Sequence, residues 1–305
     1  MFILIFEQLL KMFFIMVLAF VCFKIRLVDQ NGNKTVSNLL LLVVNPILII
    51  TVYQTEYDPA LVRGLLLAFA AAAATHVLGI LISTLLIRPK AGADYSIERF
   101  NAMYSNCGFI GIPLIGSVLG DTGVFYLSAY MVMFNLFSWT HGVVLMEKKL
   151  SMKSLKDGLI SPMFIATLTA VLLFFLRLKI PSVLLDSMNY IADMNTPLAM
   201  MVAGFSVAQA DLGKMCRNLR LYYASAVKLI IFPLLTIPLL MLFHLPSEVS
   251  MTVLIAAACP SATTGTIMAI RYKQNYTYSS EIFSMTTIFA VVTMPLLVLI
   301  AEQVL

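Results

Sequence analysis

The stretch that decides the fold reads Ala258-Cys259-Pro260-Ser261-Ala262-Thr263-Thr264-Gly265, in the middle of an otherwise apolar segment, 248–271. A second stretch of the same kind, Asn106-Cys107-Gly108-Phe109-Ile110-Gly111-Ile112-Pro113, lies in the segment 98–119. Proline removes a backbone donor and clashes with the preceding turn, and glycine weakens a helix further. Both segments are therefore predicted to be helices that break near their middle.

The surroundings of these breaks are too apolar for a soluble protein. Of the 305 residues, 61% are hydrophobic and only 11% are charged, whereas soluble domains carry about 25% charged residues. The solvent of most side chains must then be lipid. The net charge of +5 lies in short connections between apolar segments, so a nucleic-acid-binding patch is not expected. The four cysteines lack metal-ligand spacing, and neither a metal nor another cofactor is expected.

About 20 mostly apolar residues cross the hydrocarbon core as a helix, and ten such spans are predicted. They cover 4–26, 36–54, 62–87, 98–119, 122–146, 158–177, 184–208, 219–243, 248–271 and 278–303. Fifteen of the 20 Lys and Arg residues fall in the connections after odd-numbered spans. By the positive-inside rule these connections are cytoplasmic, and both termini lie outside the cell membrane.

An internal repeat appears when the chain is shifted by about 151 residues. Asn45-Pro46 then meets Thr196-Pro197, Cys107 meets Cys259 within one residue, and His76 meets Lys228. Each half contains five predicted spans, an odd number, so the second copy, 151–305, must be inverted relative to the first, 1–150. Inverted repeats are typical of secondary transporters, which hold their substrate near mid-membrane between the repeats.

The breaks supply chemistry for an anion. Non-helical backbone at membrane depth persists only inside protein or along a wet cavity, and a half-helix that begins there presents N–H groups and a partial positive charge. The alternative is that the prolines only kink packed helices. The candidate substrate-binding residues are Asn106, Gly108, Pro113, Asn195, Lys228, Pro260, Ser261 and Thr264.

Two ionisable residues at membrane depth need separate interpretations. Lys228 is expensive in mid-membrane, so we expect it to face the interior and serve a negative helix end or a substrate carboxylate; the alternative is snorkelling to the interface. His76 is a candidate proton-coupling group, and a packed neutral histidine explains it equally well.

At these residues the chain resembles the auxin efflux carrier family, which includes plant auxin carriers and bacterial malate or malonate permeases. The resemblance rests on the run from Asn106 to Pro113, on Asn195-Thr196-Pro197-Leu198-Ala199-Met200, on 228–233 and on Cys259-Pro260-Ser261-Ala262. It implies two inverted five-helix repeats whose broken helices 4 and 9 cross at mid-membrane. It also implies a scaffold of helices 1, 2, 6 and 7, with a homodimer formed through it, and a transport domain of helices 3–5 and 8–10 that moves like an elevator.

The predicted function is thus secondary transport of a small organic anion, coupled to protons, to sodium or to neither. An anion channel and a transporter-derived sensor remain alternatives. The sequence contains no phosphate-binding loop, His-Glu-x-x-His motif or Gly-x-Ser-x-Gly elbow, so an enzyme is not expected.

Overall fold

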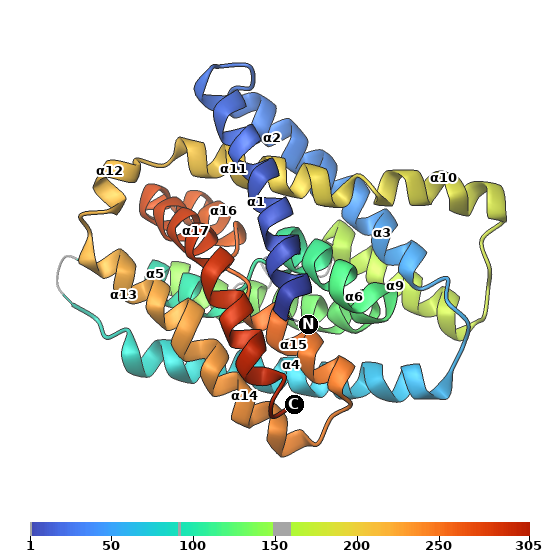
Figure 1. Cartoon of the computed structure of the whole chain (residues 1–305). Coiled ribbons are helices and arrows are strands. Elements are labelled where there is room, and N and C mark those ends of the chain that lie inside the picture. Colours follow the sequence, from blue (N-terminus) through green and yellow to red (C-terminus); the bar gives the residue numbers. More distant parts are fainter. Residues whose placement is uncertain (1, 91–92, 149–159) are drawn as a thin grey trace.

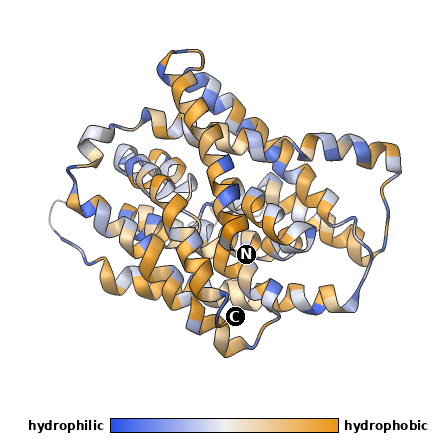
Figure 2. Ribbon diagram, viewed as in Figure 1, coloured by the Kyte–Doolittle hydropathy of each residue, from blue (hydrophilic) through white to orange (hydrophobic). Residues whose placement is uncertain are grey.

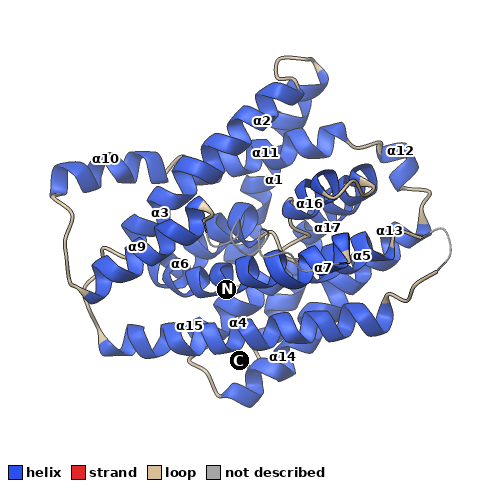
Figure 3. Cartoon of the chain, turned by 180° about the vertical axis from the view of Figure 1, so that it is seen from behind, coloured by secondary structure: helices blue, strands red, loops and turns tan. Residues whose placement is uncertain are grey.

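Helices dominate the part of the chain that the structure describes. The computed structural model describes residues 2–90, 93–148 and 160–305, and within them it contains no strand, only one isolated β-bridge (Figures 1 and 3). Seven helical runs in these ranges are long and apolar enough to cross a membrane, and Pro162–Phe175 and Ser247–Ala258 are shorter apolar helices. The all-α membrane architecture is therefore confirmed, and the ten-span inverted repeat stays a prediction.

The first half contains long helices joined by short connections. Its elements are α1 (Phe2–Lys24), α2 (Gln30–Leu39), η1 (Leu40–Val44), α3 (Asn45–Val52), α4 (Pro59–Leu86), α5 (Tyr95–Met103), η2 (Cys107–Gly111), α6 (Ile112–Phe137), η3 (Ser138–Gly142) and α7 (Val143–Glu147). The predicted span 98–119 is divided between α5 and the run that begins with η2. Gly120, with φ of 63° and ψ of −160°, kinks α6 between the predicted spans 98–119 and 122–146.

The second half contains more short helices. Its elements are α9 (Pro162–Phe175), α10 (Ser182–Ala192), α11 (Asn195–Gln209), α12 (Leu212–Met215), α13 (Leu219–Ala226), η4 (Val227–Ile231), α14 (Phe232–Phe243), α15 (Ser247–Ala258), α16 (Thr264–Arg271) and α17 (Tyr276–Ala301). The predicted span 248–271 is divided into two helices, α15 and α16, by the non-helical residues 259–263. By contrast, α10 and α11 form one run, Ser182–Gln209, and α13, η4 and α14 form another, Leu219–Phe243.

Local sequence explains where several helices begin. Asp58 accepts a hydrogen bond from the Ala60 N–H at 2.8 Å, and Pro59 occupies the first helical position of α4. Ser161 caps α9 in the same way, again before a proline. An oxygen-bearing cap followed by proline satisfies or removes N–H groups that have no partner inside the helix.

Three π-helical turns share one relation to proline. The residues that precede Pro46, Pro113 and Pro233 each donate their N–H to the carbonyl five residues back, which closes η1, η2 and η4. Proline has no N–H and its ring clashes with the carbonyl four residues earlier. The turn before it widens by one residue, and such π-bulges occur frequently at functional sites.

Close helix packing depends on a small residue at one crossing. A Cβ on Gly204 of α11 would lie 2.3 Å from the Met16 carbonyl oxygen of α1, so only glycine permits this approach. α1 packs along α11 and also contacts α17 (Figure 1). Small residues that let backbones approach are typical of membrane helix interfaces, where packing replaces the hydrophobic effect.

The outer surface of the bundle is apolar. Exposed side chains include Phe14 and Leu18 of α1, Val183 of α10 and Leu242 of α14, and hydrophobic residues cover most of the ribbon (Figure 2). A water-soluble protein rarely exposes apolar patches of this extent. The surface is suited to lipid.

Some predictions fall outside the described residues. They concern the boundary between the repeats at 150 and 151, the start of the span 158–177, and the basic residues Lys149, Lys153 and Lys156.

Candidate functional site

Two non-helical segments meet inside the bundle. The chain leaves the helix after Met103 at the end of α5 and after Ala258 at the end of α15. The Asn106 N–H donates to the Pro260 carbonyl at 2.7 Å, and the Ala262 N–H donates to the Tyr104 carbonyl at 2.9 Å. These bonds form an antiparallel bridge between Ser105 and Ser261, and loop segments lie at the centre of the bundle in Figure 3.

Side chains satisfy further backbone groups at this bridge. The fully buried Ser105 and Ser261 donate to the carbonyls of Ala257 and Asn101, at 3.0 Å and 2.7 Å. The Ser261 N–H donates to Thr286 Oγ1 at 3.1 Å. An unpaired peptide group in hydrocarbon would cost several kcal/mol, so these bonds make the irregular backbone tolerable at depth.

Lys228 lies against the same bridge. It is 0% exposed, and its Nζ donates to Ser105 Oγ at 2.5 Å and to the Ala257 carbonyl at 2.9 Å. This carbonyl belongs to the last turn of α15, where the helix dipole is negative. The snorkelling alternative is therefore wrong. Both partners are uncharged oxygens, and among the described residues no carboxylate forms an ion pair with Lys228.

Asn106 begins the half-helix that follows the first break. It is buried and is the N-cap of η2, where its Oδ1 accepts from the Phe109 N–H at 3.4 Å. Its Nδ2 has no hydrogen-bond partner. A buried amide group with a free donor is costly unless something accepts from it.

A second buried amide faces the same half-helix. Asn195 Nδ2 at the start of α11 donates to Asn45 Oδ1 at the start of α3, at 2.7 Å. Asn45 Nδ2 lies 3.9 Å from the position that a Cβ would take on Gly108 in η2. Asn45 was not among the predicted site residues. The internal repeat could have indicated it, because Asn45 aligns with Thr196, which directly follows the predicted site residue Asn195.

A pocket of about 600 Å³ opens beside these amides. It lies between α1, α3, α10 and α11 on one side and the first turns of α6 on the other. Two predicted site residues, Pro113 and Asn195, line it. The remaining predicted residues lie elsewhere: Lys228, Pro260 and Ser261 at the bridge, Asn106 and Gly108 at the start of η2, and Thr264 at the start of α16.

His76 is packed among aromatic rings. Its imidazole stacks on Phe137 with ring centroids 5.2 Å apart, and its centroid is 4.8 Å from that of Tyr130. Nδ1 bonds the Ala72 carbonyl at 2.7 Å, and Nε2 has no partner. The packed environment agrees with a structural histidine, and the free Nε2 keeps the proton-coupling prediction open.

The two buried cysteines of the breaks lie close together. A Cβ on Gly111 would be 3.4 Å from Cys107 Cβ and 3.5 Å from Cys259 Sγ. Both cysteines are free thiols. Among the described residues, no group of three or more His, Cys, Asp or Glu side chains is placed to hold a metal ion.

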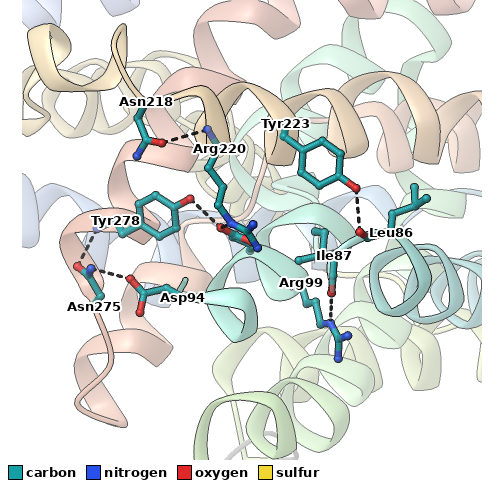
Figure 4. Close-up of polar contacts among 10 residues, drawn as sticks. Leu86, Ile87, Asp94, Arg99, Asn218, Arg220, Tyr223, Asn275 and Tyr278 are labelled. Carbon is teal, nitrogen blue, oxygen red and sulfur yellow. Dashed lines mark hydrogen bonds and ion pairs between the residues drawn. The ribbon is translucent and has the colours of Figure 1, made fainter. Parts of the chain in front are cut away.

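Sequence reasoning missed an ionic cluster in which Arg220 and Tyr278 bind one buried carboxylate (Figure 4). Glu98 of α5 is 0% exposed and binds Arg220 of α13 through two hydrogen bonds, at 2.5 Å and 2.7 Å. The Tyr278 hydroxyl of α17 donates to the same carboxylate at 2.9 Å. The cluster joins three helices that are far apart in sequence.

Comparison with known proteins was consistent with a membrane carrier. The profile of a family described as membrane transport protein matches residues 4–298. The uncharacterized transporter YfdV of Escherichia coli (strain K12) is 26% identical over 226 residues, which are 70% of this chain and 71% of that protein. The uncharacterized transporter MJ1031 of Methanocaldococcus jannaschii is 24% identical over 204 residues, or 64% of this chain and 65% of that protein.

Proposed function

Since the chain belongs to the membrane transport protein family, in agreement with its resemblance to the auxin efflux carriers, we propose that it is a secondary transporter of a small organic anion. The family is one of transporters and not of enzymes. The substrate class, the elevator movement, the cell membrane as location and the external termini are parts of this proposal.

The burial of Lys228 without a counter-ion supports an anionic substrate. A charge removed from water is strongly destabilising unless an opposite charge or several hydrogen bonds compensate for it. In its protonated form Lys228 has two neutral partners. The residue after Ser105, which is a partner of Lys228, is Asn106. The Asn106 backbone bonds the Pro260 carbonyl, and its side-chain Nδ2 has no partner. A substrate carboxylate would supply the missing charge and accept from the free donor.

The pocket supports movement of one part of the bundle against the other. Its walls come from α1, α3, α10 and α11, which belong to the proposed scaffold, and from α6, which belongs to the proposed transport domain. Such a boundary is where an elevator would slide. His76 is the candidate coupling group if protons drive transport, and sodium remains the other candidate ion.

Uptake by proteoliposomes tests the proposal. We expect purified protein to accumulate radiolabelled organic acids saturably, and to exchange external label for internal unlabelled acid in counterflow. Lys228→Met should abolish uptake, whereas Lys24→Met, at the exposed end of α1, should leave it unchanged. Uptake without saturation or counterflow would indicate a channel, and normal uptake by a folded Lys228→Met variant would contradict the anion site.

A further inference from the structure

The pair formed by Asn45 and Asn195 has one free donor and one free acceptor. Asn195 Nδ2 donates to Asn45 Oδ1, and Asn45 Nδ2 and Asn195 Oδ1 have no partner although both residues are buried. If both amides were flipped, the direction of the bond would reverse, and the pair would still present one amide N–H and one amide oxygen. This property does not depend on how the amide atoms are assigned.

One member of the pair lines the pocket and the other lies near the start of η2. Asn195 and the adjacent Thr196 line the pocket, while Asn45 Nδ2 approaches Gly108, two residues after the N-cap Asn106. The pair therefore connects the pocket wall, at Asn195, with the half-helix that Asn106 caps, at Asn45.

The charge of the pocket wall is acidic. Asp121 and Asp193 line it, and none of the described lining residues is Lys, Arg or His. A ligand carboxylate placed here meets like charges, and near Asn195 Oδ1 it would oppose one acceptor with another, because a carboxylate has no proton to donate.

From this arrangement we infer that the substrate is a monoanionic organic acid whose second polar group is neutral and offers both a donor and an acceptor, such as a carboxamide, rather than a dicarboxylate dianion. The inference rests on the proposed function and names its substrate class. The carboxylate binds toward Lys228 and Asn106. The neutral group accepts from Asn45 Nδ2 and donates to Asn195 Oδ1.

Succinate and its half-amide, succinamate, form a matched pair of probes. They have the same length and shape, and near neutral pH succinate is a dianion and succinamate a monoanion. A buried acceptor left unpaired or repelled lowers affinity by about tenfold. We expect succinamate to be taken up with a half-saturating concentration about tenfold lower than that of succinate, and to stabilise the purified protein against heat at correspondingly lower concentration. Equal or better recognition of succinate would overturn the inference.

Substitutions in the pair identify the source of the preference. Asn195→Leu should reduce it to about twofold or less, because the acceptor is lost. Asn33→Ala is the control, because this buried amide bonds Ser206 instead. A tenfold preference that persists in Asn195→Leu would contradict the assignment.

The two proposals fail in different ways. A protein that binds succinamate tenfold more tightly but transports neither acid would contradict the transport proposal alone. A protein that transports succinate in preference to succinamate would contradict only the substrate class. If neither acid is transported or stabilises the protein, both proposals fall.

Discussion

Replacement of Arg220 by methionine should destabilise the bundle more than removal of the exposed neighbouring charge of Arg217. The carboxylate of Glu98 is 0% exposed, and without Arg220 its one remaining hydrogen-bond partner among the described residues is the Tyr278 hydroxyl. Removing one member of a buried ion pair costs about 3–5 kcal/mol, because the remaining charge is uncompensated. The Arg220 side chain is 29% exposed, so water screens the pair in part, and we expect the lower end, about 3 kcal/mol.

A double variant separates the lost pair from the stranded charge. Glu98→Gln combined with Arg220→Met removes the buried charge together with its partner, so it should cost only about 1.5 kcal/mol. Unfolding by SDS in mixed micelles measures both values, and Arg217→Met, an exposed neighbour, should stay within about 0.5 kcal/mol of the unsubstituted protein. If Arg220→Met matches that control, or if the double variant is less stable than Arg220→Met, the cluster does not stabilise the fold as its geometry indicates.

Three further substitutions test the site and the packing. Asn106→Ala should raise the substrate concentration for half-maximal uptake about tenfold, since it removes a free donor beside the paired breaks; an unchanged value would make Asn106 structural. Gly204→Val should lower the unfolding free energy in micelles by about 2 kcal/mol or more, because its Cβ would overlap the Met16 carbonyl, and unchanged stability would contradict the close contact. Tyr53→Phe removes the buried bond to Ser128 and should cost about 1 kcal/mol in the same assay; stabilisation would show that the hydroxyl is not needed there.

Much of the architecture could be predicted because it follows from solvent and local chemistry. Lipid requires long apolar helices, and their runs are visible in the sequence as the spans 62–87 and 219–243, close to Pro59–Leu86 and Leu219–Phe243. The burial of Lys228 was predicted from the cost of a charge at depth. Its hydrogen bond to the Ala257 carbonyl, in the last turn of α15, agrees with the expected attraction to a negative helix terminus.

The pairings between distant residues could not be predicted. Glu98 appeared to begin a span and Arg220 to be one of several cytoplasmic cations, and nothing local in the sequence indicates that they meet across 122 residues. Asn45 and Asn195 are separated by 150 residues, and a single amide at depth has too many candidate partners for sequence to choose among them. Hydropathy determines that a polar residue faces inward, but only packing determines which partner it meets.

The widened turns before Pro46, Pro113 and Pro233 have a consequence for the orientation of the helices that follow. One additional residue per turn rotates all later side chains about the helix axis by roughly 100° relative to an uninterrupted helix. The faces on either side of each proline are then out of phase, so a helical wheel drawn through such a span mixes its lipid-facing and inward-facing positions. Lys228 lies inside one of these turns, and its direction is therefore set by the widened turn and not by the periodicity of α14.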